Sequence, residues 1–241
     1  MTPDAPRLVL FDLDGCLVDS EPLSLQALVA EIRAAGLDGL DFENVRDRFL
    51  GVTLADIVAH VESELGHAVP EGFEDRFHER LYALYAERLE RIDAMVSVAE
   101  RLAAEGVTIA IASGGSAGRI RHTLDLTGLR DLFGDRLFTG EEVGRGKPAP
   151  DLFLYAAGQL DMPPGMACVI EDSPHGIEGA RRAGMRAIGF TGGTHLDGIR
   201  VAQARRLLDA GAACVLADAS EVYPAIMDAR LGLDAPRRVR G

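Results

Sequence analysis

Four short polar segments of the sequence contain side chains that together could carry out phosphoryl transfer. They are residues 12–15, 113–115, 146–148 and 171–173, with the sequences DLDG, SGG, GKP and EDS. A carboxylate can attack phosphorus as a nucleophile, and a second carboxylate can transfer protons. A lysine and acidic metal ligands can neutralise the charge that develops during the reaction. Each segment alone is ordinary, because aspartate and glycine often form turns and acidic residues often begin helices. Their occurrence together favours a catalytic site.

The elements that must position these segments are predicted strands. Apolar runs at residues 8–11, 107–112 and 167–170 each indicate a buried strand, and each ends directly before one of the segments. The remaining segment, 146–148, precedes a predicted helix at residues 150–160. In open α/β sheets, ligands bind beyond the carboxyl ends of the strands. We therefore expect the four segments to meet at one edge of a sheet.

The order of the predicted elements indicates an α/β fold with an inserted helical domain. From residue 91 onward, strands and helices alternate, which is typical of a mostly parallel sheet covered on both faces. The strand at residues 8–11 needs partners, and only this second half supplies them. We therefore expect a Rossmann-like parallel sheet core from residues 1–18 and 91–241, and an all-helical domain at residues 19–90. Three stretches of helical apolar periodicity fall within that insert: 22–35, 54–65 and 73–90.

Composition and charge exclude several classes of partner. The chain has 241 residues, 47% of them hydrophobic, and a net charge of −13. A chain of this length and composition can bury a sizeable core, and its acidic surface repels nucleic acid and anionic membranes. A phosphorylated substrate would be repelled too, so a phosphate site needs a local cation from a metal or a lysine. We expect no nucleic acid and no membrane as partners, and a monomer as the default state.

The cysteines and the N-terminal residues predict a cytoplasmic location. Cys16, Cys168 and Cys214 are far apart and show no metal-ligand spacing, which indicates reduced thiols. The N-terminal residues lack a charged segment followed by a long apolar stretch, so we expect no signal peptide. No apolar run of the sequence approaches the length of a membrane span.

Four ordered motifs of the sequence resemble those of a known family. FDLDGCLVDSE, IASGG, GKPAPD and IEDSPHGIEGARRAG are similar to the motifs of the haloacid dehalogenase-like hydrolase superfamily. They resemble in particular the subgroup with a helical cap inserted after the first motif, which contains β-phosphoglucomutase and many sugar-phosphate phosphatases. This resemblance implies a Mg²⁺-dependent phosphatase that hydrolyses a small phosphorylated metabolite through an aspartyl phosphate. A sugar or sugar-acid phosphate is the substrate class expected from the subgroup.

The same resemblance implies the catalytic and metal-binding residues. Asp12 would attack phosphorus, and Asp14 would protonate the leaving oxygen and later activate water. Asp172 would bind Mg²⁺ together with Asp12 and the backbone carbonyl of Asp14. Glu171 would lie in or near the outer shell of the metal. An oxygen site with few carboxylates and retained waters suits Mg²⁺.

Substrate-binding residues follow in the same way. Ser113 and Lys147 would hold phosphate oxygens, and we count both among the catalytic residues. Backbone N–H groups at Gly15 and Gly114 would contact the phosphate. Arg48, in the inserted cap, is the predicted cap residue that contacts the substrate. None of the six histidines has a spacing that assigns it to the site.

Other activities of the family fit the sequence less well. Dehalogenases lack the second aspartate of the first motif, so Asp14 argues against carbon–halogen cleavage. Phosphonate hydrolysis would need a cap lysine, and residues 21–90 contain none. A β-phosphoglucomutase-like mutase stays the alternative, although Ser24 stands where mutases have a histidine. The apolar run at residues 50–54 also replaces basic residues of the mutase cap.

A non-catalytic binding protein with the same fold is the hypothesis from a different functional class. Such a protein has no reason to keep a nucleophile, a proton-transfer group, a cation and a metal ligand together. The sequence keeps all four, as Asp12, Asp14, Lys147 and Asp172. We therefore expect an enzyme.

Overall fold

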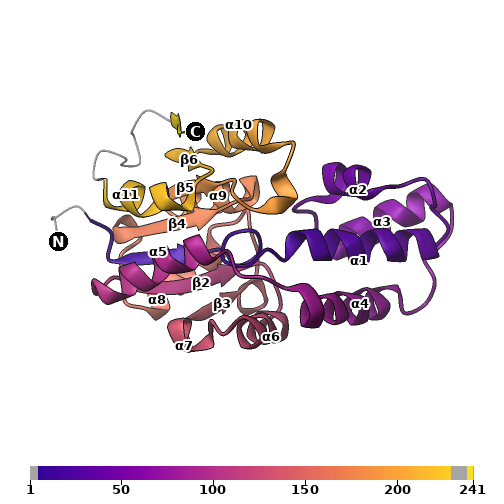
Figure 1. Cartoon of the computed structure of the whole chain (residues 1–241), viewed down its shortest axis with the longest axis horizontal. Coiled ribbons are helices and arrows are strands. Elements are labelled where there is room, and N and C mark those ends of the chain that lie inside the picture. Colours follow the sequence, from indigo (N-terminus) through magenta and orange to yellow (C-terminus); the bar gives the residue numbers. More distant parts are fainter. Residues whose placement is uncertain (1–4, 229–237, 241) are drawn as a thin grey trace. The chain divides into compact units, whose positions relative to one another are not determined.

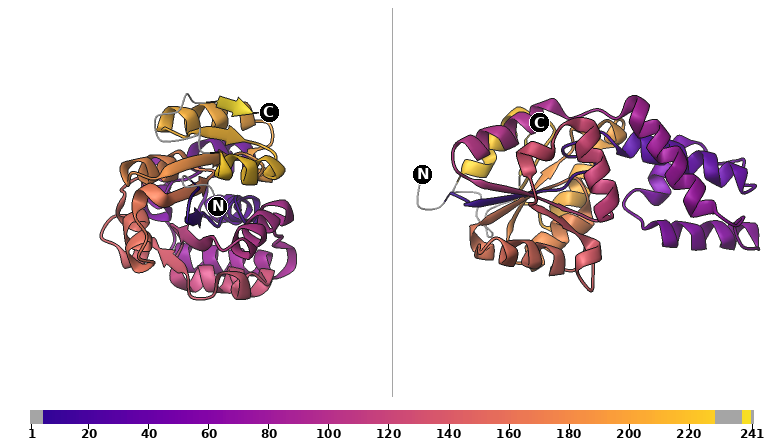
Figure 2. Two further views of the ribbon diagram at one scale, coloured as in Figure 1. Left: turned by 90° about the vertical axis from the view of Figure 1, so that its left-hand side faces the viewer. Right: turned by 90° about the horizontal axis from the view of Figure 1, so that it is seen from below.

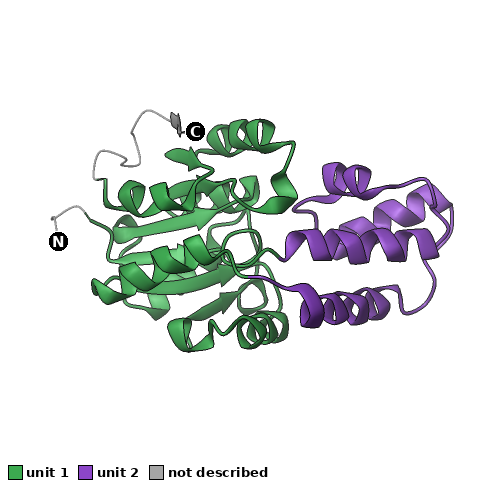
Figure 3. Ribbon diagram, in the orientation of Figure 1, with its two compact units in different colours: residues 1–19, 91–241 green, residues 20–90 purple. Residues whose placement is uncertain are grey.

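The chain is built from two compact units, which are Met1–Asp19 with Arg91–Gly241 and Ser20–Glu90 (Figure 3). The computed structural model describes residues 5–228 and 238–240. The larger unit contains a β-sheet, whereas the described elements of the smaller unit are all helices.

A parallel sheet forms the centre of the larger unit (Figure 1). Within the described residues it has seven strands in the order β3-β2-β1-β4-β5-β6-β7, and each pair of neighbours runs parallel. This arrangement confirms the predicted α/β fold class. The strands are β1 Leu8–Phe11, β2 Thr108–Ser113, β3 Leu137–Thr139, β4 Ala167–Glu171, β5 Arg186–Phe190, β6 Cys214–Leu216 and β7 Arg238–Arg240.

Helices cover both faces of this sheet (Figure 2). Because successive side chains of a strand point to opposite faces, Leu8 and Leu10 of β1 face the same side. There they belong to one buried cluster with Phe153, Ile177 and Leu207, which come from three successive long helices. The helices of this unit are α5 Asp93–Ala104, α6 Ala117–Thr127, α7 Arg130–Phe133, α8 Asp151–Gln159, α9 Pro174–Arg182, α10 Arg200–Ala210 and α11 Val222–Met227. Short 3₁₀ turns occupy Gly140–Glu142, Pro164–Met166, Thr194–Leu196 and Ala219–Glu221.

The strand β1 lies in the middle of the sheet between β2 and β4. Phe11 at its end is level with Ile111 of β2 and with Ile170 of β4. The polar residues at the carboxyl ends of these three strands therefore share one edge of the sheet. Sequence periodicity located these strands to within a residue, but it did not predict α7 or α11, which are too short to show a pattern.

The smaller unit consists of four helices among the residues that the structure describes. Sequence periodicity predicted three of them and missed α2, which contains only eight residues. Its local signal is at its start, where Asp41 accepts a hydrogen bond from the backbone nitrogen of Asn44 and the Asn44 side chain bonds back to Asp41. This reciprocal pair is a capping box built with asparagine in place of the usual glutamate. The helices are α1 Glu21–Ala34, α2 Phe42–Phe49, α3 Leu54–Leu65 and α4 Phe73–Arg88.

No described helix in either unit has the length and apolar character that crossing a membrane would require.

A buried carboxylate links α1 to α4 inside the smaller unit. Glu31 of α1 is 1% exposed, and Arg76 and Arg80 of α4 hold its two oxygens at 3.0 to 3.1 Å. The two arginine side chains are 41% and 48% exposed. Removing the arginines would leave a buried charge uncompensated, whereas removing the glutamate would leave two cations that can turn to water.

The double change Arg76→Ala and Arg80→Ala should destabilise this unit by about 2 kcal/mol, less than for a fully buried pair because the arginines are half exposed. Glu31→Met removes the charge at similar volume and should change stability by less than about 1 kcal/mol. Hydrogen exchange of the α1 and α4 amides measures both effects. Arg88→Ala on the same helix is the matched control, because its partner Gln26 is uncharged. Equal destabilisation by the arginine and glutamate changes would contradict this account.

Candidate active site

Lys147 joins the ends of three strands at the polar edge of the sheet. Its ammonium nitrogen Nζ donates to Asp12 Oδ1 at 2.6 Å, to Glu171 Oε1 at 2.5 Å and to the backbone oxygen of Ala112 at 2.9 Å. These acceptors belong to the carboxyl ends of β1, β4 and β2. An ammonium group has three N–H donors, so each of them has an acceptor in the protein.

Burial and charge shift the pKa values of these groups. Burial raises the pKa of Asp12 well above its ordinary value, with Lys147 opposing the rise and Glu171 and Asp172 adding to it. Burial also raises the pKa of Glu171, again against the opposing effect of Lys147. Burial by itself would lower the pKa of Lys147, but the charges of Asp12 and Glu171 outweigh it and raise that pKa. Lys147 therefore stays protonated and favours the ionised form of both carboxyl groups.

Both oxygens of Glu171 accept hydrogen bonds from the protein. Oε1 accepts from Lys147, and Oε2 accepts from the backbone nitrogen of Ser173 at 3.1 Å. The side chain is 1% exposed, and a Cβ at Gly176 would lie only 1.8 Å from Oε1, so a glycine is needed there. The resemblance predicts Glu171 in or near the outer shell of a metal, and that role stays a prediction. These contacts show that the Glu171 side chain also holds Lys147.

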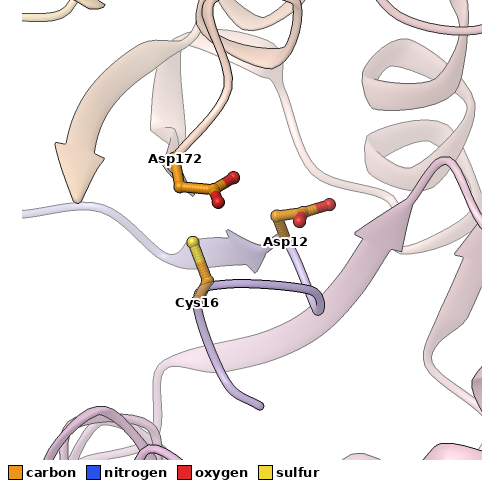
Figure 4. A group of neighbouring side chains, drawn as sticks. All are labelled: Asp12, Cys16 and Asp172. Atoms are coloured by element: carbon orange, nitrogen blue, oxygen red, sulfur yellow. The ribbon is translucent and has the colours of Figure 1, made fainter. Parts of the chain in front are cut away.

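Asp12 and Asp172 form the part of the site that could hold a metal ion. With Cys16 they form a buried group whose donor atoms lie within 4.8 Å of one another (Figure 4). Two carboxylates this close repel each other, and a cation between them would offset the repulsion. Burial, followed by the nearby carboxylates, raises the pKa of the Cys16 thiol well above its usual range. The thiol therefore stays protonated, which leaves an oxygen donor set that fits Mg²⁺.

Residues distant in sequence support Asp172. His195 Nε2 lies 3.1 Å from Asp172 Oδ2, and Gln203 Nε2 donates to the backbone oxygen of Asp172 at 2.8 Å. Gly15 has a φ of +74°, and a Cβ there would lie 2.1 Å from Asp172 Oδ2, so the loop can pass the carboxylate only as glycine. Sequence reasoning missed His195 because it lies in the turn Thr194–Leu196, outside the polar segments. The available signal was the glycine pair at residues 192–193, directly before that turn, since a Cβ at Gly193 would lie 2.7 Å from the His195 ring.

Ser113 ends β2 at the same edge of the sheet and is 1% exposed. Its Oγ accepts a hydrogen bond from the backbone nitrogen of Gly115 at 3.1 Å. A hydroxyl that accepts one bond can still donate its own proton. The adjacent Gly114 is exposed. This arrangement suits Ser113 to donate to an anionic oxygen.

The second aspartate of the first segment contacts an arginine that sequence reasoning missed. Asp14 Oδ2 accepts a hydrogen bond from Arg119 Nη2 at 2.8 Å. Arg119 lies in the first turn of α6, beyond the short motif that ends β2. Its only signal in the sequence is a cation shortly after a strand end, which by itself predicts a solvated side chain.

Arg48, the predicted substrate contact of the cap, belongs to the smaller unit. It lies in the last turn of α2, where its Nη1 donates to Glu64 Oε1 at 2.8 Å. The Arg48 side chain is 45% exposed. This ion pair connects α2 with α3 and gives Arg48 a contact inside its own unit.

Comparisons with known proteins agree on one family. The model of the haloacid dehalogenase-like hydrolases matches residues 6–184. The 6-phosphogluconate phosphatase of Escherichia coli (strain K12) is 30% identical over 188 residues, which cover 78% of this chain and 83% of that protein. Validoxylamine A 7'-phosphate phosphatase of Streptomyces hygroscopicus subsp. limoneus is 32% identical over 208 residues, covering 84% of this chain and 92% of that protein.

Solved structures lead to the same group. The crystal structure of a HAD family hydrolase from Deinococcus radiodurans R1, which has phosphate and sodium bound, superimposes with a TM-score of 0.76 and 33% identity. The similarity covers 97% of this chain and all of that one. The core and the helical insert are therefore both part of the similarity.

Replacing Lys147 with methionine should lower stability more at alkaline than at acidic pH. Without the ammonium, the folded pKa values of Asp12 and Glu171 rise further above the unfolded values of about 4. A raised carboxyl pKa contributes stability that is present below the unfolded pKa and is lost as pH rises through the folded pKa. We expect a loss of about 3 kcal/mol near pH 8 and a smaller loss near pH 5, measured by chemical denaturation with a chelator present.

The control for that experiment is Glu171→Gln in the Lys147→Met background. It removes one of the two buried negative charges that Lys147 contacts, so part of the lost stability should return near neutral pH. A loss of stability that is independent of pH, or that Glu171→Gln deepens, would show that Lys147 acts mainly through packing.

Proposed function

The chain belongs to the haloacid dehalogenase-like hydrolase family, and we propose that the site around Lys147 is that of a Mg²⁺-dependent phosphatase. Its family and its relatives identify it as a phosphoric monoester hydrolase. The observation that carries the finer proposal is the Lys147 ammonium between Asp12 and Glu171, at 2.6 and 2.5 Å. With Asp172 in the same buried group, a nucleophile, a cation and a metal ligand are available together.

In the first step, a carboxylate oxygen of Asp12 attacks the phosphorus of the ester. The bond from Asp12 to phosphorus forms while the bond from phosphorus to the ester oxygen breaks. Asp14 gives its proton to that oxygen, and the alcohol leaves. Asp14 is therefore protonated before this step and ionised after it.

In the second step, water attacks the phosphorus of the aspartyl phosphate. Asp14 now accepts the proton from water as the new oxygen–phosphorus bond forms. The bond between phosphorus and Asp12 breaks, inorganic phosphate is released, and both aspartates return to their starting forms. The reaction consumes one water and one ester for each phosphate and alcohol formed.

The Mg²⁺ of this proposal would be held by Asp12, Asp172 and the backbone oxygen of Asp14. When bound, it supplies positive charge that offsets the charge of the phosphoryl oxygens. The remaining positive charge in the site comes from the protein itself. Lys147 lowers the repulsion between Asp12 and an incoming anion in a protein whose net charge is −13.

Ser113 and Lys147 would act on the phosphate in different ways. Ser113 can donate its hydroxyl proton while accepting from Gly115. All three N–H donors of Lys147 already have protein acceptors, so a direct bond to phosphate would replace one of them. We assign to Lys147 chiefly the neutralisation of Asp12, and to Ser113 the direct bond.

The substrate class is a small sugar or sugar-acid phosphate. The support comes from the relatives, since 6-phosphogluconate is itself a sugar-acid phosphate and the relative from Escherichia coli is named for hydrolysing it. A substrate contact by Arg48 stays a prediction, as do the monomeric state and the cytoplasmic location. The proposed partner is a small phosphorylated metabolite.

Asp12→Asn should lower turnover by about a thousandfold or more, because an amide is a poor nucleophile. Asp172→Asn should weaken Mg²⁺ binding by at least about tenfold, since it removes one of few anionic ligands. Titration calorimetry on the chelator-treated protein measures binding without relying on activity. Circular dichroism of both variants should match the wild type. Substantial turnover by Asp12→Asn would end the covalent mechanism.

The mutase alternative makes a different prediction about products. A mutase must hold a second phosphate of its substrate, which carries nearly two negative charges and needs local cations. Residues 50–54 supply none, and Ser24 replaces the histidine of mutases. We therefore expect free phosphate from both simple phosphate esters and glucose 1-phosphates, with no need for a bisphosphate activator. Rapid isomerisation with little free phosphate, stimulated by a sugar bisphosphate, would instead establish a mutase.

A further inference from the structure

Asp14 and Arg119 form an ion pair that none of the assigned roles explains. Their contact of 2.8 Å joins residues 105 positions apart in sequence. The side chain of Asp14 is 11% exposed and that of Arg119 is 22% exposed. The pair therefore lies at the polar edge of the sheet with limited access to water.

The backbone around Arg119 is built to hold its side chain there. Ser116 caps α6 and its hydroxyl accepts from the backbone nitrogen of Arg119 at 3.2 Å. Glu141 accepts from the backbone nitrogen of Ala117 at 2.9 Å, which fixes the same turn. The guanidinium passes over Gly115, where a Cβ would lie 2.6 Å from Nη2. The absence of a side chain at Gly115 is thus what gives the guanidinium its path.

The loop that carries Asp14 does not need this ion pair to fold. Its turn is closed by its own backbone hydrogen bonds, from Gly15 to Val18 at 2.9 Å and from Leu17 to Leu13 at 2.9 Å. What Arg119 fixes is the direction of the Asp14 side chain.

We propose that Arg119 is a positioning residue that aims the Asp14 carboxyl group at the leaving oxygen of the substrate. This inference rests on the proposed function, in which Asp14 gives a proton to that oxygen. Proton transfer requires the two oxygens to approach within about 3 Å. A displacement of about 1 Å at a reacting group can lower the rate by about a hundredfold.

The test uses the basicity of the leaving group. The nitrophenolate of p-nitrophenyl phosphate leaves without a proton, whereas the alkoxide of glycerol 1-phosphate needs one. Arg119→Ala should therefore lower kcat/KM for glycerol 1-phosphate by about a hundredfold and change it for p-nitrophenyl phosphate by less than about threefold. The ratio kcat/KM reports the steps up to the departure of the alcohol, so hydrolysis of the aspartyl phosphate does not mask the effect.

Matched glycine variants test the same contact without removing the arginine. Gly115→Ala should displace the guanidinium and reproduce the selective loss. Gly118→Ala, next to Arg119 in α6, has nothing within 4 Å of the added carbon. This variant should leave kcat/KM unchanged for both esters. Adding Arg119→Ala to Asp14→Asn should lower kcat/KM for glycerol 1-phosphate by less than about twofold beyond Asp14→Asn alone, because a residue that acts through Asp14 is not additive with it.

Each outcome has one meaning. Selective loss with the alkyl ester, reproduced by Gly115→Ala and absent after Asp14→Asn, supports the proposal. Equal losses on the two esters, or unchanged rates on both, overturn it. If the wild-type protein hydrolyses neither ester with Mg²⁺ present, the proposed function itself fails, and that result is distinct from any result of the variants.

Discussion

The structure of the site depends on one cation among buried carboxylates. Lys147 contacts the carboxyl ends of three neighbouring strands, and its charge lets Asp12 and Glu171 lie together in a protein of net charge −13. This is possible only because β1 lies between β2 and β4, where its last residue pairs with Ile111 and Ile170 near the carboxyl ends of those strands. A different order of strands would separate the groups that Lys147 holds together. The strand order of the sheet therefore determines which charged groups meet in the site.

Much of the site could be predicted from the sequence, because its residues lie at the ends of strands and beside glycines that closely approach the carboxylates. Asp12, Ser113 and Glu171 each adjoin an apolar run that is easily recognised as a buried strand. Parallel strands then bring their carboxyl ends to one edge, so linear order predicts proximity. Gly15 lies in the first of these segments and Gly176 lies in the motif that contains the last, and the carboxylates of Asp172 and Glu171 occupy the space where side chains at these glycines would be.

The residues that the sequence did not reveal reach the site from elsewhere. Arg119 and His195 lie on elements that follow the motifs, and their contacts with Asp14 and Asp172 depend on how those elements pack. No local pattern distinguishes such a side chain from a solvated one. The helix α2 was missed for a related reason, since its eight residues carry too few apolar positions to show a period. Whether Arg119 and His195 reach the site depends on contacts between distant segments, which the composition of the sequence does not show.

The central place of β1 also governs the order in which the chain can fold. β1 precedes the other described strands in the chain, but its neighbours begin only at Thr108 and Ala167. The helices of Ser20–Glu90 make contacts that are closer in sequence, and such contacts form faster than pairings between distant segments. The helical unit can therefore be complete while Leu8–Phe11 still has both of its backbone edges unpaired. During synthesis, the exposure of these four apolar residues creates a risk of misassembly.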